Sequence, residues 1–166
     1  MILAVDVDYG DSSAIVAGVM FESWDDEDSE DIYISRIEGV ADYVPGSFYK
    51  RELPCILALL TEHKLSPEVI VIDGFVYLNG VDEPGLGKHL YDALDGKIAV
   101  IGVAKRAFKG IDEKYATYRG GSKKPLYVTA EGIDVQNARR AVETMHGKFR
   151  TPALLKKVDQ VCRQKC

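Results

Sequence analysis

Two short apolar runs that each carry an aspartate most constrain how this chain can fold. Asp6 interrupts the apolar run 2–7, and Asp73 directly follows the apolar run 69–72. Short, uniformly apolar runs are typical of strands that are covered on both faces of a sheet. We therefore expect both aspartates to lie at or near the ends of buried strands.

Two further acids fall in predicted helices. Glu52 lies in the first turns of a helix between the two apolar runs, and Asp159 lies in the last predicted helix. Gathering carboxylates beside a core is costly unless a cation compensates them, and the usual partner of an all-oxygen set is a hard divalent cation such as magnesium. The pattern predicts a metal-dependent hydrolase.

Lys105 directly follows another buried strand and is the candidate for a contact to a phosphate or a transition state. The alternative for Lys105 is an ordinary solvated lysine. Arg51, next to Glu52, is a candidate for a structural ion-pair partner.

Periodicity and turn residues predict the order of the elements. We expect strands at 1–8, 12–21, 32–37, 68–73, 98–103 and 126–129, and helices at 47–63, 86–94, 135–145 and 152–164. This order describes an α/β fold of the ribonuclease H-like type, a mixed sheet with antiparallel strands first and helices on its faces. No linker rich in serine, glycine or proline divides the chain, so we expect residues 1–166 to form one domain.

Charge is distributed very unevenly along the chain. Residues 1–96 hold 20 acidic and 5 basic side chains, whereas residues 97–166 hold 6 acidic and 16 basic ones. Such a split is a hint of a face that binds a polyanion, although the net charge is −5. Seven of the acids lie within residues 22–31, which we interpret as a solvated loop between two strands.

The remaining composition bears on location. The three cysteines lack CxxC spacing, which favours reduced thiols over disulfides or a zinc site. The sequence contains no apolar run long enough to span a membrane, and its first residues lack the features of a secretory leader. We therefore expect a cytoplasmic protein with no membrane association.

Several blocks of the sequence match, in order, the motifs of one nuclease family. The blocks are Ala4–Tyr9, Tyr43–Gly46 followed by Arg51–Pro54, Val71–Gly74, Ile101–Lys105, and Phe149–Pro152. On these blocks the chain resembles the endonuclease V family, which acts at deaminated purines, chiefly inosine, in DNA or RNA. The matches span most of the chain.

The resemblance implies roles for individual residues. Magnesium, for which manganese could substitute, would be held by Asp6, Glu52, Asp73 and Asp159, and Lys105 would act beside the first three as a catalytic group. Tyr43, followed by Pro45 and Gly46, would push into the strand next to the lesion. The flipped base would enter a pocket to which Gly46, Phe48, Gly74 and Ala104 contribute. The implied product is a nick at the second phosphodiester 3′ to the lesion.

The segment after Gly74 departs from the family pattern. After Gly74 the family usually carries a histidine-proline-arginine triplet, whereas this chain continues with residues 75–80 and has Asn79 in place of the histidine. The departure leaves open a relative that binds inosine-containing nucleic acid but has lost cleavage. A metal-dependent enzyme that acts on a small nucleotide is a third reading. The intact set of acids favours the nuclease.

Overall fold

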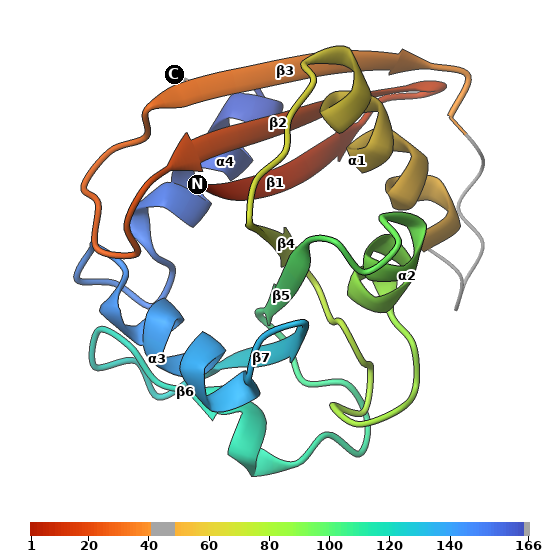
Figure 1. The fold of residues 1–166 in the computed structure, drawn as a ribbon. Coiled ribbons are helices and arrows are strands. Elements are labelled where there is room, and N and C mark those ends of the chain that lie inside the picture. The colour runs from red at the N-terminus through yellow and green to blue at the C-terminus, as the bar shows by residue number, and fades with distance from the viewer. Residues whose placement is uncertain (41–48, 165–166) are drawn as a thin grey trace.

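A seven-stranded mixed sheet organises the protein (Figure 1). The computed structural model describes residues 1–40 and 49–164. The strands are β1 (Ile2–Tyr9), β2 (Ser13–Phe21), β3 (Asp31–Glu38), β4 (Val69–Asp73), β5 (Ala99–Ala104), β6 (Ala116–Thr117) and β7 (Leu126–Glu131). The helices are α1 (Tyr49–Glu62), α2 (Leu86–Ala93), α3 (Val135–Thr144) and α4 (Ala153–Cys162), with a short 3-10 turn at Glu113–Tyr115.

The strand order is β3-β2-β1-β4-β5-β7-β6. Strands β1, β2 and β3 form an antiparallel meander, and β4 then pairs in parallel with both β1 and β5. Strand β7 returns antiparallel to β5 and also pairs with β6. The parallel strands β1, β4 and β5 therefore place their C-terminal ends at one edge of the sheet.

Helices cover both faces of the sheet and divide the core in two. One cluster packs α1 and α2 against the sheet through buried side chains that include Ile56, Leu59 and Leu90. The other cluster packs α3 and α4 against the opposite face through Val142, Leu154 and other apolar residues. Strands β1 and β4 contribute to both clusters, which explains why their sequences are apolar without alternation.

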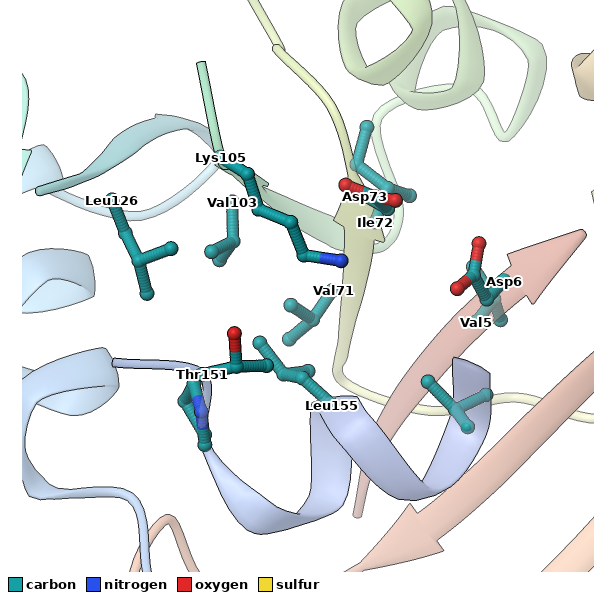
Figure 2. A pocket seen from close by; sticks show the side chains of 12 residues that line it. Val5, Asp6, Val71, Ile72, Asp73, Val103, Lys105, Leu126, Thr151 and Leu155 are labelled. Carbon is teal, nitrogen blue, oxygen red and sulfur yellow. The ribbon is translucent and has the colours of Figure 1, made fainter. Parts of the chain in front are cut away.

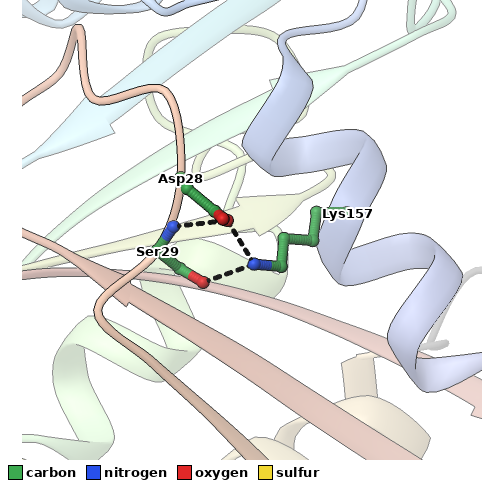
Figure 3. A network of polar contacts seen from close by, with 3 residues as sticks. All are labelled: Asp28, Ser29 and Lys157. Carbon is green, nitrogen blue, oxygen red and sulfur yellow. Dashed lines mark hydrogen bonds and ion pairs between the residues drawn. The ribbon is translucent and has the colours of Figure 1, made fainter.

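The acidic segment 22–31 connects β2 to β3 and contacts α4 at one point (Figure 3). The Lys157 ammonium donates hydrogen bonds to a carboxylate oxygen of Asp28 and, at 2.8 Å, to the hydroxyl of Ser29. The side chain of Asp28 is 78% exposed, so solvent screens this ion pair and it contributes little to stability. The contact nevertheless links the acidic loop to the helix that carries Asp159.

The predicted order of strands and helices is confirmed, and the ends differ by a few residues. Pro54 lies inside α1, where it removes one backbone hydrogen bond, yet the helix continues because its buried face packs on the sheet. The two-residue strand β6 and the 3-10 turn were not predicted. In the described residues, no helix has the length and apolarity needed to cross a membrane.

Candidate active site

Three of the predicted site residues lie at the C-terminal edge of the parallel strands. Extending the β1–β4 register by two residues brings Asp6 level with Asp73. Asp73 pairs with Val103, and Lys105 follows two residues later. Because side chains alternate along a strand, Asp73 and Lys105 share the face of the sheet to which Val103 belongs, the face covered by α3 and α4.

Two helices bring the other acids to this edge. Glu52 lies in the first turn of α1 and is only 8% exposed. Asp159 lies on α4, which packs against β1 and β2. One donor atom each from Asp6, Asp159 and Cys162 lie within 4.8 Å of one another, a spacing at which one metal ion could contact all three.

Asp6 lies against the core of the protein. It is 9% exposed, and its carboxylate accepts a hydrogen bond of 2.9 Å from the backbone N–H of Val7. Burial, followed by the negative charge of Asp73, raises the pKa of Asp6 to about 7. Asp159 adds to the rise. Without a cation, Asp6 therefore tends to hold a proton near neutral pH.

The pKa of Glu52 is raised for the same reasons as that of Asp6. Burial raises its pKa to about 8, and the charges of Asp6 and Asp73 act in the same direction. The Oε2 atom of Glu52 is buried and has no hydrogen-bond partner among residues 1–40 and 49–164. A buried carboxylate oxygen left unpaired is costly, so this atom is positioned for a ligand rather than for the stability of the protein alone.

Positively charged side chains counteract the effect of burial on the pKa values of the other two acids, Asp73 and Asp159. Burial raises the pKa of Asp73, and the nearby Lys105 ammonium partly offsets the rise. Burial would also raise the pKa of Asp159, but the hydrogen bond and charge of Arg163 outweigh it and lower the pKa. The Arg163 Nε lies 2.9 Å from Oδ1 of Asp159, one helical turn earlier on α4.

A small cavity of about 20 Å³ lies beside Asp6 and Asp73 (Figure 2). Asp6, Asp73 and Lys105 line its polar side, and Thr151 and Leu155 approach from the segment that begins α4. Apolar side chains of β1, β4, β5, β7 and the α4 segment line the remainder. Asp6 and Asp73 therefore border a cavity that is largely apolar and restricts water, which strengthens electrostatic interactions within it.

The other predicted site residues divide into two groups. Gly74 directly follows β4, and Ala104 is the last residue of β5. The backbone N–H of Gly74 donates a hydrogen bond of 3.1 Å to the carbonyl oxygen of Val103. Neither lines the cavity beside the acids. The predicted residues Tyr43, Pro45, Gly46 and Phe48 lie outside the described residues.

Sequence reasoning missed the neighbours of Asp159. Cys162 and Arg163 lie three and four residues further along α4, so both point to the same side of the helix as Asp159. The spacing of three and four residues from Asp159 was the sequence signal that could have identified these two neighbours. Arg119 and Arg150, which hold the segment before α4, carried no comparable signal because they bind backbone carbonyls distant in the sequence.

The donor set fits a divalent cation. The charges of Asp6, Glu52, Asp73 and Asp159 act on one another. The group of donor atoms that lie within 4.8 Å of one another consists of Asp6, Asp159 and Cys162, and it does not include Glu52 or Asp73. A bound cation would relieve the repulsion that raises the pKa values and would give the unpaired Glu52 oxygen a partner. Oxygen ligands favour a hard ion, and the thiol of Cys162 adds one softer donor nearby.

Comparison with curated proteins finds relatives that share one name. Endonuclease V of Streptomyces avermitilis is 32% identical over 145 residues, which cover 74% of this chain and 61% of the relative. Endonuclease V of Streptomyces coelicolor is 38% identical over 108 residues, which cover 63% of this chain and 41% of the relative. The matched region therefore spans between about two fifths and three fifths of these relatives.

Solved structures share the fold over nearly the whole chain. The endonuclease V structure from Streptomyces avermitilis has a TM-score of 0.75 at 27% identity and covers 98% of this chain and 79% of that one. Human ENDOV has a TM-score of 0.77 at 22% identity, with 98% and 82% covered. The structure of Ciona intestinalis endonuclease V in complex with a 24mer DNA containing an inosine has a TM-score of 0.81 at 18% identity, with 98% and 84% covered.

These likenesses confirm the ribonuclease H-like fold expected from the order of strands and helices. The family model described as Endonuclease V matches residues 1–133, which is most of the sequence. The chain therefore belongs to the endonuclease V family.

Proposed function

We propose that the chain is a metal-dependent endonuclease that cuts DNA or RNA beside a deaminated purine. The observation that carries the proposal is the group of mutually repelling carboxylates around Glu52, whose buried Oε2 has no partner in the described part of the chain. That arrangement is unfavourable for a protein without a ligand and suits one that binds a cation. Magnesium is the proposed ion, with manganese as a substitute.

The proposed ligands are Asp6, Glu52, Asp73 and Asp159. If a divalent ion bound there, it would supply Lewis-acid chemistry for the phosphodiester and for the attacking water. The protein residues orient the ion and the substrate, because their positions are set by strands and helices rather than by loops. Lys105 approaches the same cavity and is proposed to contact the phosphate that gains negative charge during cleavage.

Inosine is the proposed lesion. A relative of the same fold was solved with DNA that contains an inosine, and the sequence blocks of this chain resemble the family. We propose that Tyr43, Pro45 and Gly46 wedge beside the lesion, and that Phe48 and the backbone near Gly74 and Ala104 help to form the base pocket. Extruding a base costs a few kcal/mol, and less where pairing is weak, which favours deaminated bases. The proposed role is nucleic-acid repair in the cytoplasm.

The test uses end-labelled oligonucleotides with a single inosine, supplied as single-stranded DNA, duplex DNA and RNA. Reactions contain magnesium, manganese or EDTA, and unmodified oligonucleotides serve as controls. We expect a metal-dependent nick at the second phosphodiester 3′ to the inosine. Binding of the inosine strand without any cutting would instead support a relative that has lost cleavage.

A variant pair tests the role of the acids. Asp73→Ala should reduce cleavage at least a hundredfold, roughly the loss expected when a metal-orienting group is removed, while most binding remains. Glu143→Ala is the matched control, because Glu143 is an exposed acid on α3, away from the cavity. Full cleavage by Asp73→Ala would refute the proposed mechanism.

A further inference from the structure

A buried arginine holds the loop that precedes α4. Arg119 is 7% exposed, and its guanidinium donates hydrogen bonds to the backbone carbonyls of Met145, Gly147, Phe149 and Arg150 at 2.5, 3.0, 2.9 and 3.2 Å. Burial lowers the pKa of Arg119. Within residues 1–40 and 49–164, it forms no ion pair with a carboxylate. This costly arrangement therefore serves to position loop 145–150.

Two further features restrict the same loop. Arg150 donates hydrogen bonds to the carbonyls of Lys124, Pro125 and Lys105, so it ties the loop to the residue beside the acids. A Cβ at Gly120 would lie 2.5 Å from the carbonyl oxygen of Lys148, closer than real atoms approach. The backbone of the loop is therefore anchored from several sides.

This anchored loop presents an aromatic side chain to solvent. Phe149 is 65% exposed, more than any other large hydrophobic residue in the described part of the chain. A single exposed apolar residue is common on protein surfaces and says little by itself. Phe149, however, also lies next to two hollows that are lined by lysine side chains.

Phe149 borders two hollows on the surface. The first has a volume of about 620 Å³, and its charged lining consists of Lys148 and Lys156, with His146 beside them. The second, of about 340 Å³, is lined by Lys105 and Asp159 among others. Phe149, Thr151 and Lys156 line both hollows. A continuous, mainly basic surface thus leads from the carboxylates past Phe149.

We propose that this surface binds an unpaired stretch of the substrate strand as it leaves the cleavage site. One base would stack on Phe149, and Lys148 and Lys156 would contact phosphates on either side of it. An exposed aromatic ring between lysines is the combination that recognises single strands, because every base offers a face for stacking and every linkage a charge. The inference rests on the proposed function and assigns a substrate subsite beyond the lesion pocket.

The first test measures affinity for a labelled single-stranded oligonucleotide containing inosine, by fluorescence anisotropy in an Asp73→Ala background that does not cut. Phe149→Ala should weaken binding roughly five- to 150-fold, the range measured for loss of one stacked base. Phe149→Trp should restore it. Tyr118→Ala is the matched control, since Tyr118 is 55% exposed but lines neither hollow.

The second test separates phosphate contacts from stacking. Affinity falls as salt rises, so the slope of log affinity against log salt is negative. The double variant Lys148→Gln/Lys156→Gln should make this slope less steep by about 1.4, about 0.7 for each phosphate contact. Lys97→Gln, an exposed lysine near the opposite ends of the strands, should leave the slope unchanged. Replacing each base in turn with 2-aminopurine should identify one position whose fluorescence is quenched by the parent protein and not by Phe149→Ala.

Two results would overturn the proposal. Parental affinity in both the Phe149 and the lysine variants, with unchanged melting temperatures, would show that the strand follows another path. A lysine effect without any Phe149 effect would reduce the surface to a patch for phosphates and refute the stacking. If the parent protein bound no nucleic acid at all, the proposed function would fail as well, which is a distinct outcome.

Discussion

The acids at the sheet edge are unfavourable for the protein without a cation. Asp6 and Glu52 are each less than a tenth exposed, and their pKa values rise to about 7 and about 8. Desolvation is the largest cause in both cases. The fold thus retains charged groups where apolar residues would be more stable, which is typical of functional sites.

The raised pKa values predict how stability depends on pH. In the unfolded chain Asp6 and Glu52 lose their protons near pH 4, whereas in the metal-free folded protein they retain them to about pH 7 and 8. Over that window the folded state binds more protons, so its stability should fall as pH rises, by roughly 1.4 kcal/mol per pH unit for each group. Thermal melts in EDTA between pH 5 and pH 8 measure the slope.

The variant Glu52→Gln sharpens this measurement. It removes one titrating group, so it should flatten the slope and raise the melting temperature of the metal-free protein at pH 8, while cleavage is lost. Magnesium should stabilise the parent at pH 8 more than it stabilises the variant. Glu143→Gln should reproduce the parental slope, and an identical slope in Glu52→Gln would contradict the origin assigned to it.

At the scale of elements, close packing at β5 positions the site. Gly102 faces the chain that leaves β4: a Cβ there would lie 2.5 Å from the carbonyl oxygen of Gly74 and 2.9 Å from the hydroxyl of Thr129. That hydroxyl accepts a hydrogen bond of 2.8 Å from the N–H of Val76. The absence of a side chain at Gly102 therefore allows β4 and β5 to approach where Asp73 and Lys105 emerge.

Gly102→Ala is accordingly expected to be costly. The added methyl meets backbone atoms that cannot move freely, so we expect a loss of about 1 to 3 kcal/mol in the free energy of unfolding, measured by urea denaturation. Gly10→Ala is the control, because the nearest atom there is the mobile hydroxyl of Ser13 at 3.1 Å. Equal stabilities of the two variants would refute the packing argument.

The loop before α4 is a second element whose position depends on specific contacts, here the hydrogen bonds from Arg119. Arg119→Met keeps an apolar stem but removes the hydrogen bonds to four carbonyls, and we expect a loss on the order of 2 to 3 kcal/mol. Amide hydrogen exchange should rise in residues 145–150 and remain unchanged in β1 and β4. Protection of that loop equal to the parent would show that Arg150 and Gly120 suffice to hold it.

At the scale of the whole molecule, we propose that the 166 residues fold as one unit. The single tryptophan, Trp24, packs against the α3–α4 side of the core and lies 6.0 Å, centroid to centroid, from the ring of Phe21. Its fluorescence therefore reports on tertiary packing, while far-ultraviolet circular dichroism reports on all helices and strands. We expect the two urea transitions to coincide, and separate midpoints would indicate two units.

Much of the fold follows from local patterns in the sequence. The apolar runs of β1 and β4 and the period of α1 and α4 predicted these elements because burial imposes a repeat on each of them. The run that ends at Asp73 also predicted an acid at a strand end. Strand β6 was missed because two residues carry no period, and Ala116–Thr117 become a strand only by pairing with β7.

The sequence by itself determined the family and the order of strands and helices, because both follow from short blocks of neighbouring residues. The same blocks led to the prediction of the four acids. Tertiary structure decided what those blocks do together. Only the parallel register brings Asp6 level with Asp73, and only the packing of α4 against β1 brings Asp159 and Cys162 within 4.8 Å of Asp6. The role of Arg119 likewise depends on carbonyls some 26 to 31 residues away. Residues that are far apart in the sequence share no local pattern. Their contacts therefore could not be predicted from the sequence and became apparent only in the folded structure.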